Sequence, residues 1–222
     1  MNSSSIEIKH TWTIIGTGKE SVLELRAIWP PAVLSSKSPI TKHFRATEFQ
    51  SIEACKEAFE SEALRLNGLG YNIYIVMNPI KPNFIGGAAT DADIDYRDLL
   101  LIDIDRVEKK REPATDDEVG AAGQLAEHVM AYLSELGWAE PIRVMSGNGH
   151  HLYYVLSNTP NNDVSKEYVQ SLLKKLAAKF DNSIVKIDTS VFNASRITKV
   201  VGTVARKGIE SEGRPYRMAH VL

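Results

Sequence analysis

One order of elements in residues 99–188 limits this chain to very few folds. Hydrophobic periodicity predicts strands at residues 99–105, 142–145, 151–156 and 184–188, and amphipathic helices at 116–136 and 163–180. The resulting β-α-β-β-α-β order is a split βαβ unit, in which an antiparallel sheet carries both helices on one face. We therefore predict an α+β fold, ferredoxin-like or RRM-like, with strand order 4-1-3-2. Polymerase palms and RNA-recognition modules share this unit, so the fold alone assigns no function.

The residues before this unit form an additional N-terminal α/β part. A strand is predicted at residues 21–28, a helix at 51–66 and a further strand at 71–77. We expect a single domain over residues 1–222, with the N-terminal part at 1–70 and a palm at 71–222. The last residues, His220-Val221-Leu222, lie in a strand-like stretch, which suggests a domain cut from a longer protein.

Composition and charge restrict the class of protein. The sequence is 43% hydrophobic, its longest apolar run is far below the roughly 18 residues of a membrane span, and its polar start lacks a signal-peptide pattern. We therefore expect a cytoplasmic protein with no membrane partner. The single cysteine, Cys55, excludes a disulfide framework and a cysteine zinc site. Net charge is -2, but residues 186–217 hold seven basic residues against three acidic ones. This segment is either a phosphate-binding surface or a salt-bridged, solvated one.

The strand at residues 99–105 reads LLLIDID and ends in two carboxylates, Asp103 and Asp105. Side chains alternate along a strand, so both acids share one face with Leu99 and Leu101. Residues two apart lie about 6.6 Å from each other, and two carboxylates at that spacing repel unless a positive group lies between them. Mg²⁺ fits, because it binds one or two carboxylates together with water and substrate phosphates. The alternative is a strand end that emerges into solvent with both acids exposed.

A tight turn is predicted before the third strand, over the segment SGNGHH (Ser146, Gly147, Asn148, Gly149, His150 and His151). In the 4-1-3-2 order, the third strand begins beside the end of the first, which places this turn and a histidine next to the two acids. Backbone N–H groups of such a turn can approach phosphate, and a histidine can bind the same oxygens. The two histidines point to opposite faces of a regular strand, which disfavours a replication-initiation nuclease with two histidines on one metal. A plain hairpin turn is the alternative.

The stretch from Ile187 to Gly208 contributes a third acid and several basic residues. Asp188 ends the fourth strand, which flanks the first, so it could supply a third carboxylate. A strand that ends at Asp188 requires a bend or a later pairing to bring this acid to the correct end of the first strand. Arg196 and Lys207 suit a triphosphate or a template backbone, Arg through its bidentate fork and Lys as a point charge.

Together these features resemble the archaeo-eukaryotic primase superfamily, the primase-polymerases. Its pattern is a strand-borne D-x-D, a glycine-rich turn leading into a histidine strand, and a strand-borne aspartate. Asp103 and Asp105 match the first motif, the turn matches the second with His151 as the functional histidine, and Asp188 matches the third. Further segments are similar to plasmid, phage and CRISPR-associated members: Asn78-Pro79, residues 90–94, Ala194-Ser195-Arg196-Ile197, Gly202-Thr203, Lys207-Gly208 and Arg214-Pro215-Tyr216-Arg217.

The resemblance spans about residues 70–220 and implies a nucleotidyltransferase that synthesises DNA or RNA on a template. It implies Mg²⁺ or Mn²⁺ held by Asp103, Asp105 and Asp188. The nucleotide-binding residues that it implies are Ser146, Gly147, Asn148, Gly149, His151, Arg196 and Lys207. The expected partners are a single-stranded DNA template with a primer, dNTPs or NTPs, and a helicase or other replication or CRISPR components. The chain lacks a cysteine-rich zinc element and a helicase motor, which leaves unaided primer initiation open.

Two other functions stay open on the sequence. The same carboxylates could serve a metal-dependent phosphodiesterase, and the same sheet could serve a non-catalytic module that binds single-stranded nucleic acid.

Two motifs that resemble known binding loops are rejected. Residues 16–19 (GTGK) lack the Ser or Thr of a phosphate loop, and residues 91–95 lack the glycine of a calcium loop.

Overall fold

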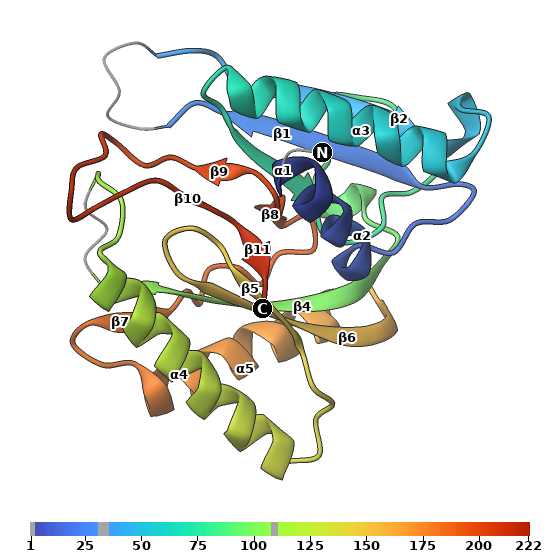
Figure 1. Cartoon of the computed structure of the whole chain (residues 1–222). Helices are drawn as coiled ribbons and strands as arrows, with labels where there is room; N and C mark the ends of the chain where they lie inside the picture. Colours follow the sequence, from blue (N-terminus) through green and yellow to red (C-terminus); the bar gives the residue numbers. More distant parts are fainter. Residues whose placement is uncertain (1–2, 31–35, 108–110) are drawn as a thin grey trace.

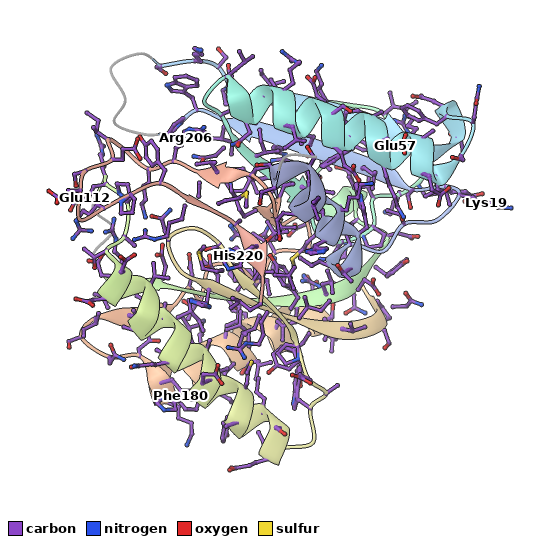
Figure 2. The ribbon with its side chains drawn as sticks, in the orientation of Figure 1. Lys19, Glu57, Glu112, Phe180, Arg206 and His220 are labelled. Atoms are coloured by element: carbon purple, nitrogen blue, oxygen red, sulfur yellow. The ribbon has the colours of Figure 1, made fainter. Side chains whose placement is uncertain are left out.

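Two antiparallel sheets lie between helices in the computed structural model, which describes residues 3–30, 36–107 and 111–222. Helix α3 (Ile52–Gly68) covers the first sheet on one side of the molecule. Helices α4 (Asp116–Glu135) and α5 (Asp163–Phe180) cover the second sheet on the opposite side (Figure 1). Charged side chains of the helices, such as Glu57 on α3, are exposed (Figure 2). The strands therefore occupy the middle of the molecule.

The second sheet contains the predicted split βαβ unit. Its strands are β4 (Tyr96–Arg106), β5 (Ile142–Met145), β6 (His150–Pro160), β7 (Val185–Ile187) and β11 (His220–Val221), in the order β11-β5-β6-β4-β7. Counted from β7, the four strands of the unit follow the predicted 4-1-3-2 order, and α4 and α5 lie on one face. The prediction of an α+β, ferredoxin-like palm is thus confirmed, and β11 is an added edge strand.

The first sheet combines strands from both ends of the chain. Its strands are β1 (Val22–Ile28), β2 (Ile40–Arg45), β3 (Asn72–Val76) and β8 (Ile197–Lys199), in the order β2-β1-β3-β8. In the β3–β8 pairing, Tyr74 lies opposite Lys199 and Ile75 lies opposite Thr198. The boundary expected at residue 70 therefore does not separate the two sheets.

Short elements complete the chain. Strands β9 (Val204–Ala205) and β10 (Arg217–Met218) pair as a separate hairpin beside the two sheets (Figure 1). The sequence did not predict the N-terminal helices α1 (Ser3–Glu7) and α2 (Thr11–Ile14), which flank a 3-10 turn at Ile8–His10. Gly202 has φ +74° and packs so closely on Ile8 that a side chain would clash with its backbone. The N-terminal segment thereby supports the turn between β8 and β9. Further 3-10 turns lie at Ala46–Glu48 and Asp91–Asp93.

The helices follow local signals that the sequence contains. Ser51, Thr115 and Asn162 cap the first turns of α3, α4 and α5 with their side-chain oxygens. The buried stripe of α4 holds Leu125, Val129 and Leu133, as its periodicity predicts. The predicted helix at 116–136 ends one residue earlier, because Leu136 is the C-cap residue and is 59% exposed. Within the described ranges, no helix is long and apolar enough to cross a membrane.

Candidate active site

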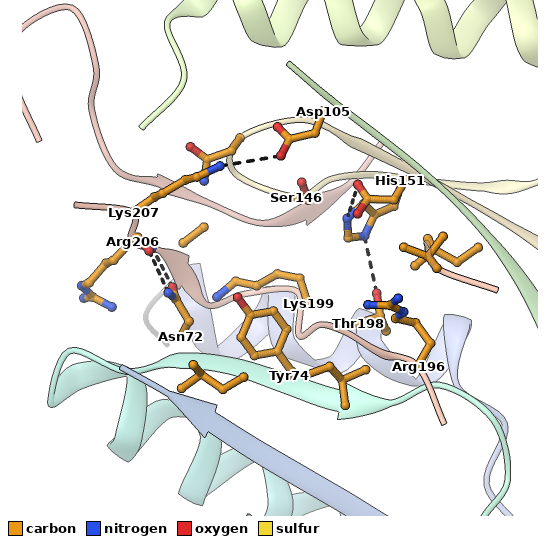
Figure 3. A pocket seen from close by; sticks show the side chains of 17 residues that line it. Asn72, Tyr74, Asp105, Ser146, His151, Arg196, Thr198, Lys199, Arg206 and Lys207 are labelled. Carbon is orange, nitrogen blue, oxygen red and sulfur yellow. Dashed lines mark hydrogen bonds and ion pairs between the residues drawn. The ribbon is translucent and has the colours of Figure 1, made fainter. Parts of the chain in front are cut away.

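A pocket of about 400 Å³ opens between the two sheets (Figure 3). The second sheet contributes β4, the start of β6 and the turn before it, while the first sheet contributes residues of β1, β3 and β8. The β9–β10 hairpin adds residues 205–207. The lining includes two carboxylates and four basic side chains, Arg196, Lys199, Arg206 and Lys207. A pocket with both charges at close quarters suits an anion that is bound together with a cation.

The two carboxylates reach the pocket through the alternation of β4. Leu101, Asp103 and Asp105 line the pocket, whereas the residues between them, Ile102 and Ile104, are fully buried in the core. This is the division of faces that the sequence predicts. Burial raises the pKa of Asp105. The charge of Lys207, whose Nζ lies 3.7 Å from Asp105 Oδ2, lowers this pKa, whereas the negative charge of Asp103 raises it further. The charged form of Asp105 is therefore penalised until a cation neutralises it.

Asp103 lies in the middle of a row of polar residues that crosses three strands. His151 on β6 is its direct partner in the β4–β6 ladder, and its Nε2 lies 3.3 Å from Asp103 Oδ1. On the other side, the Asp188 N–H donates to the Asp103 carbonyl at 2.8 Å, which extends the β4–β7 register by one residue. Residues that are directly opposite in an antiparallel pair share a face. Asp103, His151 and Asp188 thus belong to one face of the second sheet.

The position of Asp188 corrects one expectation from the sequence. A bend or a later pairing was expected to be necessary, but β7 pairs only with the last residues of β4, starting with Val185 opposite Arg106. A short strand that begins at the end of β4 reaches Asp103 after only a few residues. Asp188 does not line the pocket, and its Oδ1 accepts the Ser190 N–H at 2.9 Å.

The turn at residues 146–149 brings Ser146 and Asn148 to the pocket. Its glycines have steric roles: a side chain at Gly149 would clash with the Ile104 carbonyl, and Gly147 has φ +104° and abuts Ala205. The Ser146 N–H donates to the Gly149 carbonyl at 2.9 Å, and the Gly147 N–H to the Met145 sulfur at 3.0 Å. These two amides therefore have partners in the turn or at the end of β5, which weakens the expectation that they approach phosphate.

The two histidines of β6 face opposite ways, as the sequence predicts. His151 lines the pocket, whereas the His150 ring lies against α4, where a side chain at Gly123 would come within 3.2 Å of His150 Nε2. Burial lowers the pKa of His150, and the charge of Arg143 lowers it further. His150 is thus a core residue next to a helix, and His151 alone of the pair reaches the acids.

Four basic residues enter the pocket from the C-terminal part of the chain. Lys199 is only 5% exposed and its Nζ donates to the Val204 carbonyl at 3.2 Å. Burial, with a further contribution from the charge of Arg206, lowers the pKa of Lys199 to about 7. Arg196 Nη2 donates to the Ser190 carbonyl at 2.6 Å, and the backbone of Arg206 exchanges two hydrogen bonds of 2.7 Å with the Asn72 side chain. In the described part of the chain, Arg206 Nη1 and Arg196 Nε are buried without a hydrogen-bond partner.

Sequence reasoning named Arg196 and Lys207 but missed several other lining residues, including Tyr74, Thr198, Lys199 and Arg206. A signal for Lys199 exists, because it is a lone charge within the otherwise uncharged stretch ITKVV. A lysine in such a run is costly to bury and often marks a site. Tyr74 and Thr198 carry no such signal, because their place depends on the pairing of β3 with β8.

The segments before β4 tie it to the loop that carries Arg196. The Asn78 side chain donates to the Ala194 carbonyl and accepts the N–H groups of Asp98 and Leu99. Asp91 accepts hydrogen bonds from the N–H and hydroxyl of Ser195 at 2.8 and 2.7 Å. Asp91 is thus engaged in contacts that hold the fold together. The Gly18 N–H donates to Ser21 Oγ in the turn before β1.

The donor set can be tested against a divalent cation. Within the described residues there is no group of three or more His, Cys, Asp or Glu side chains that could hold a metal ion. Two carboxylates on one face of β4 remain, and Mg²⁺ commonly uses one or two carboxylates and takes its other ligands from water and substrate phosphates. The penalty on the charged form of Asp105 also points to a cation at this position. The residues therefore fit a Mg²⁺-like ion that binds together with a phosphate compound.

No protein-family model and no curated protein matches the sequence. Solved structures do match in fold. The archaeo-eukaryotic primase (AEP) domain of the cyanophage S-2L primase-polymerase is 17% identical at a TM-score of 0.54, covering 98% of this chain and 88% of the phage chain. The primase RepB′ is 11% identical at a TM-score of 0.56, covering 99% of this chain and 56% of the RepB′ chain. The polymerase domain of Mycobacterium tuberculosis ligase D, in complex with DNA, is 15% identical at a TM-score of 0.52, covering 92% of this chain and 75% of the ligase D chain.

These neighbours are archaeo-eukaryotic primase-type polymerases, so the resemblance predicted from the sequence is confirmed for the fold. This chain spans little more than half of the RepB′ chain. The neighbours give no support to a helicase or a CRISPR component as a partner.

Proposed function

We propose that this chain, which has the fold of the archaeo-eukaryotic primase-type polymerases, transfers nucleotides from dNTPs or NTPs to a primer on a single-stranded DNA template. The observation that carries the proposal is the pocket, in which Asp103 and Asp105 of β4 face four basic residues. A nucleoside triphosphate carries negative charge on all three phosphates, and transfer at its α-phosphorus needs cations that neutralise this charge. The pocket offers both a place for metal ions and basic side chains for the phosphates.

The acids would hold the metal. Asp103 and Asp105 are the proposed ligands, and Asp188 is the proposed third because its backbone pairs with Asp103. Bound Mg²⁺ or Mn²⁺ would supply charge neutralisation on the phosphates and a lowered pKa for the attacking primer 3′-hydroxyl. The raised pKa of Asp105 gives this residue the most to gain from such a neighbour.

The other side chains would bind and orient the triphosphate. Arg196 and Arg206 each present a guanidinium atom that lacks a hydrogen-bond partner within the described residues, and a phosphate oxygen would satisfy it. Lys199 would regain its full charge beside a phosphate, because an anion opposes the burial that lowers its pKa. Lys207 now lies near Asp105 and could turn to the phosphates when a cation replaces it there. Ser146, Asn148 and His151 would line the opposite side.

DNA as the template follows from the proposed reaction and agrees with the ligase D polymerase domain, whose structure contains DNA. The net charge of -2 does not provide a generally basic surface, so we propose that the template is held near residues 186–217, where the basic residues gather. Binding would then weaken steeply with salt.

The test is extension of a labelled primer on a single-stranded DNA template, with dNTPs or NTPs and Mg²⁺ or Mn²⁺. We expect metal-dependent extension that Asp103→Ala abolishes while its unfolding free energy stays equal or rises, because the substitution removes repulsion with Asp105. Asp98→Asn is the matched control, since Asp98 lies on the same strand but outside this pocket. An unprimed template shows whether the protein also initiates.

Other outcomes would replace the proposal. Cleavage of the template without nucleotides would indicate a phosphodiesterase. Template binding without synthesis, unchanged in Asp103→Ala and without a metal requirement, would indicate a binding module. An Asp103→Ala variant that fails to fold would make this acid structural.

A further inference from the structure

A line of hydrogen bonds joins the two sheets behind the acids. The Tyr153 hydroxyl lies 2.9 Å from His151 Nδ1 and also contacts the Thr198 hydroxyl. Thr198 Oγ1 itself lies 3.4 Å from the same His151 nitrogen (Figure 3). Tyr153 belongs to β6 of the second sheet and Thr198 to β8 of the first. His151 is therefore held on one side by two hydroxyls and faces Asp103 on the other.

The partners of the His151 ring determine which nitrogen carries the proton. Asp103 Oδ1 lies 3.3 Å from Nε2, and a carboxylate oxygen only accepts hydrogen bonds, so the favourable form has the hydrogen on Nε2. In a neutral ring, Nδ1 then carries a lone pair and needs a donor. The Tyr153 O–H is that donor, and the Thr198 O–H can in turn donate to the Tyr153 oxygen. When the hydrogen bonds run from Thr198 to Tyr153 to His151 Nδ1, each acceptor in this line has a donor.

Burial makes this arrangement stable. Tyr153 is fully buried and Thr198 is 3% exposed, so neither hydroxyl can exchange its partner for water without cost. Burial also raises the pKa of Tyr153, an effect that its hydrogen bond with Thr198 opposes and the charge of Asp103 reinforces. The phenol therefore keeps the proton that it donates. A ring flip would turn a carbon atom of His151 toward this hydroxyl and leave the donor without an acceptor.

We propose that the Tyr153 and Thr198 hydroxyls are positioning groups that fix the tautomer and orientation of His151, so that Nε2–H points to Asp103 and to the phosphates bound there. The part that concerns phosphates rests on the proposed function. The part that concerns the tautomer does not, because it follows from the contacts of His151 alone.

The first test reads the tautomer directly. Two-bond ¹H–¹⁵N correlations of the imidazoles, recorded at pH 8.5 where free imidazole is neutral, distinguish a protonated from an unprotonated ring nitrogen. The His151 signals are assigned by their loss in His151→Gln. We expect the Nε2–H form alone in the wild-type protein, and a mixture of both tautomers in Tyr153→Phe/Thr198→Val. Tyr154→Phe is the matched control, since Tyr154 packs against Trp138 and lies on the face of β6 opposite to His151.

The second test reads the effect on the reaction. Partners that orient a site residue typically contribute 10- to 100-fold to activity, so we expect kcat/KM for the incoming nucleotide to fall about tenfold or more in the double variant. KM for the primer-template should stay unchanged, whereas a general distortion of the fold would change both. Tyr153→Phe alone should lose less, because Thr198 still lies within reach of Nδ1. Melting temperatures within a few degrees of wild type show that the variants are folded.

The outcomes separate this inference from the proposed function. A wild-type protein with Nδ1–H, or a double variant that retains pure Nε2–H, overturns the inference whatever the activity. A shifted tautomer with unchanged nucleotide kcat/KM overturns the positioning role in the reaction. A protein without any synthesis but with the expected tautomers refutes the proposed function and leaves the positioning of His151 supported.

Discussion

The acidic side of the pocket is built from neighbouring positions on paired strands, whereas the basic side comes from one C-terminal segment, residues 196–207, that reaches the pocket through a long-range strand pairing. Asp103 and Asp105 are two residues apart on β4, and His151 is the direct ladder partner of Asp103. Arg196 and Lys199 depend on the pairing of β8 with β3, and Lys207 lies on a hairpin next to it. Local patterns therefore determine the acids, while long-range pairing determines the cations.

The two sides also resemble each other, because each contains one group whose charged form is disfavoured by burial. Burial raises the pKa of Asp105 and lowers the pKa of Lys199 to about 7. Both penalties decrease when an opposite charge arrives, a metal ion on the acidic side and a phosphate on the basic side. Four substitutions test this comparison, in order of decreasing expected effect.

The largest effect is expected for Asp105→Asn, on the acidic side. Nucleotide incorporation should fall more than about a thousandfold, the scale of a lost charge contact in phosphoryl transfer. Stability at pH 7 should rise, because the native pKa of Asp105 is raised and its charge disfavours folding above that pKa. The gain should vanish at a pH below the ordinary carboxyl pKa of 3.8, where the acid is neutral in both states. Chemical denaturation at several pH values, with Asp98→Asn as control, measures this; a loss of stability at pH 7 would contradict it.

Lys199→Met tests the basic side. We expect the nucleotide KM to rise about tenfold with little change in kcat, because the amine binds phosphate before and during reaction. The unfolding free energy should rise by roughly 2–4 kcal/mol at pH 7, since burial shifts the Lys199 pKa from 10.5 to about 7. The unfolded state binds more protons between these values, so the difference from wild type should shrink as pH increases from 7 to 10.5. A gain that grows with pH would contradict this, because it would mean that folding favours the charged form of Lys199.

Gly149→Ala tests how tightly the acidic side is packed. The new methyl would clash with the Ile104 carbonyl next to Asp105, and such overpacking costs about 1–3 kcal/mol. The melting temperature should fall by about 2–4 °C per kcal/mol for a chain of this size. Gly87→Ala is the matched control because its site is open. An unchanged melting temperature in Gly149→Ala would show that β4 and the turn can move apart.

The smallest effect is expected for Glu118→Gln, which weakens a contact outside the pocket between the end of β4 and the segment before β10. Glu118 accepts hydrogen bonds from Arg106 and from Arg214 of the segment before β10. Burial raises its pKa, but the hydrogen bonds of Arg214, the Thr115 N–H and Arg106 outweigh this and lower it to about 2. We expect a loss of about 1–2 kcal/mol at pH 7, allowing for partial exposure. This contribution is complete above pH 4.5 and disappears as pH falls toward 2, so wild type and variant should converge in acid.

The sequence permitted prediction of the second sheet because its signals are local. The alternation in LLLIDID, the glycine turn and the helix caps each act over a few residues, and the strand order follows from the split βαβ unit. The same reasoning gave two opposite faces for His150 and His151, as the structure shows.

The basic side of the pocket could not be predicted from such local signals. Strand β8 has only the residues Ile197–Lys199, which are too few for an alternating pattern to identify it. Its partner β3 is separated from it along the chain by the strands β4 to β7 of the second sheet. Lys199, Thr198 and Tyr74 therefore meet the acids only through a pairing that no local pattern encodes. The exchange of hydrogen bonds between Asn72 and the backbone of Arg206 is equally non-local.

Strand β8 also dictates a sequence of events during synthesis of the chain. On a ribosome, β1, β2, α3 and β3 emerge first, but the edge of β3 stays unpaired until β4 through β7 have been translated and β8 follows. Non-local pairings of this kind form late and leave strand edges exposed in the meantime. The nascent N-terminal half thus has an open edge that is prone to aggregation. The arrival of β8 closes that edge and brings the lysine to the acids in the same step.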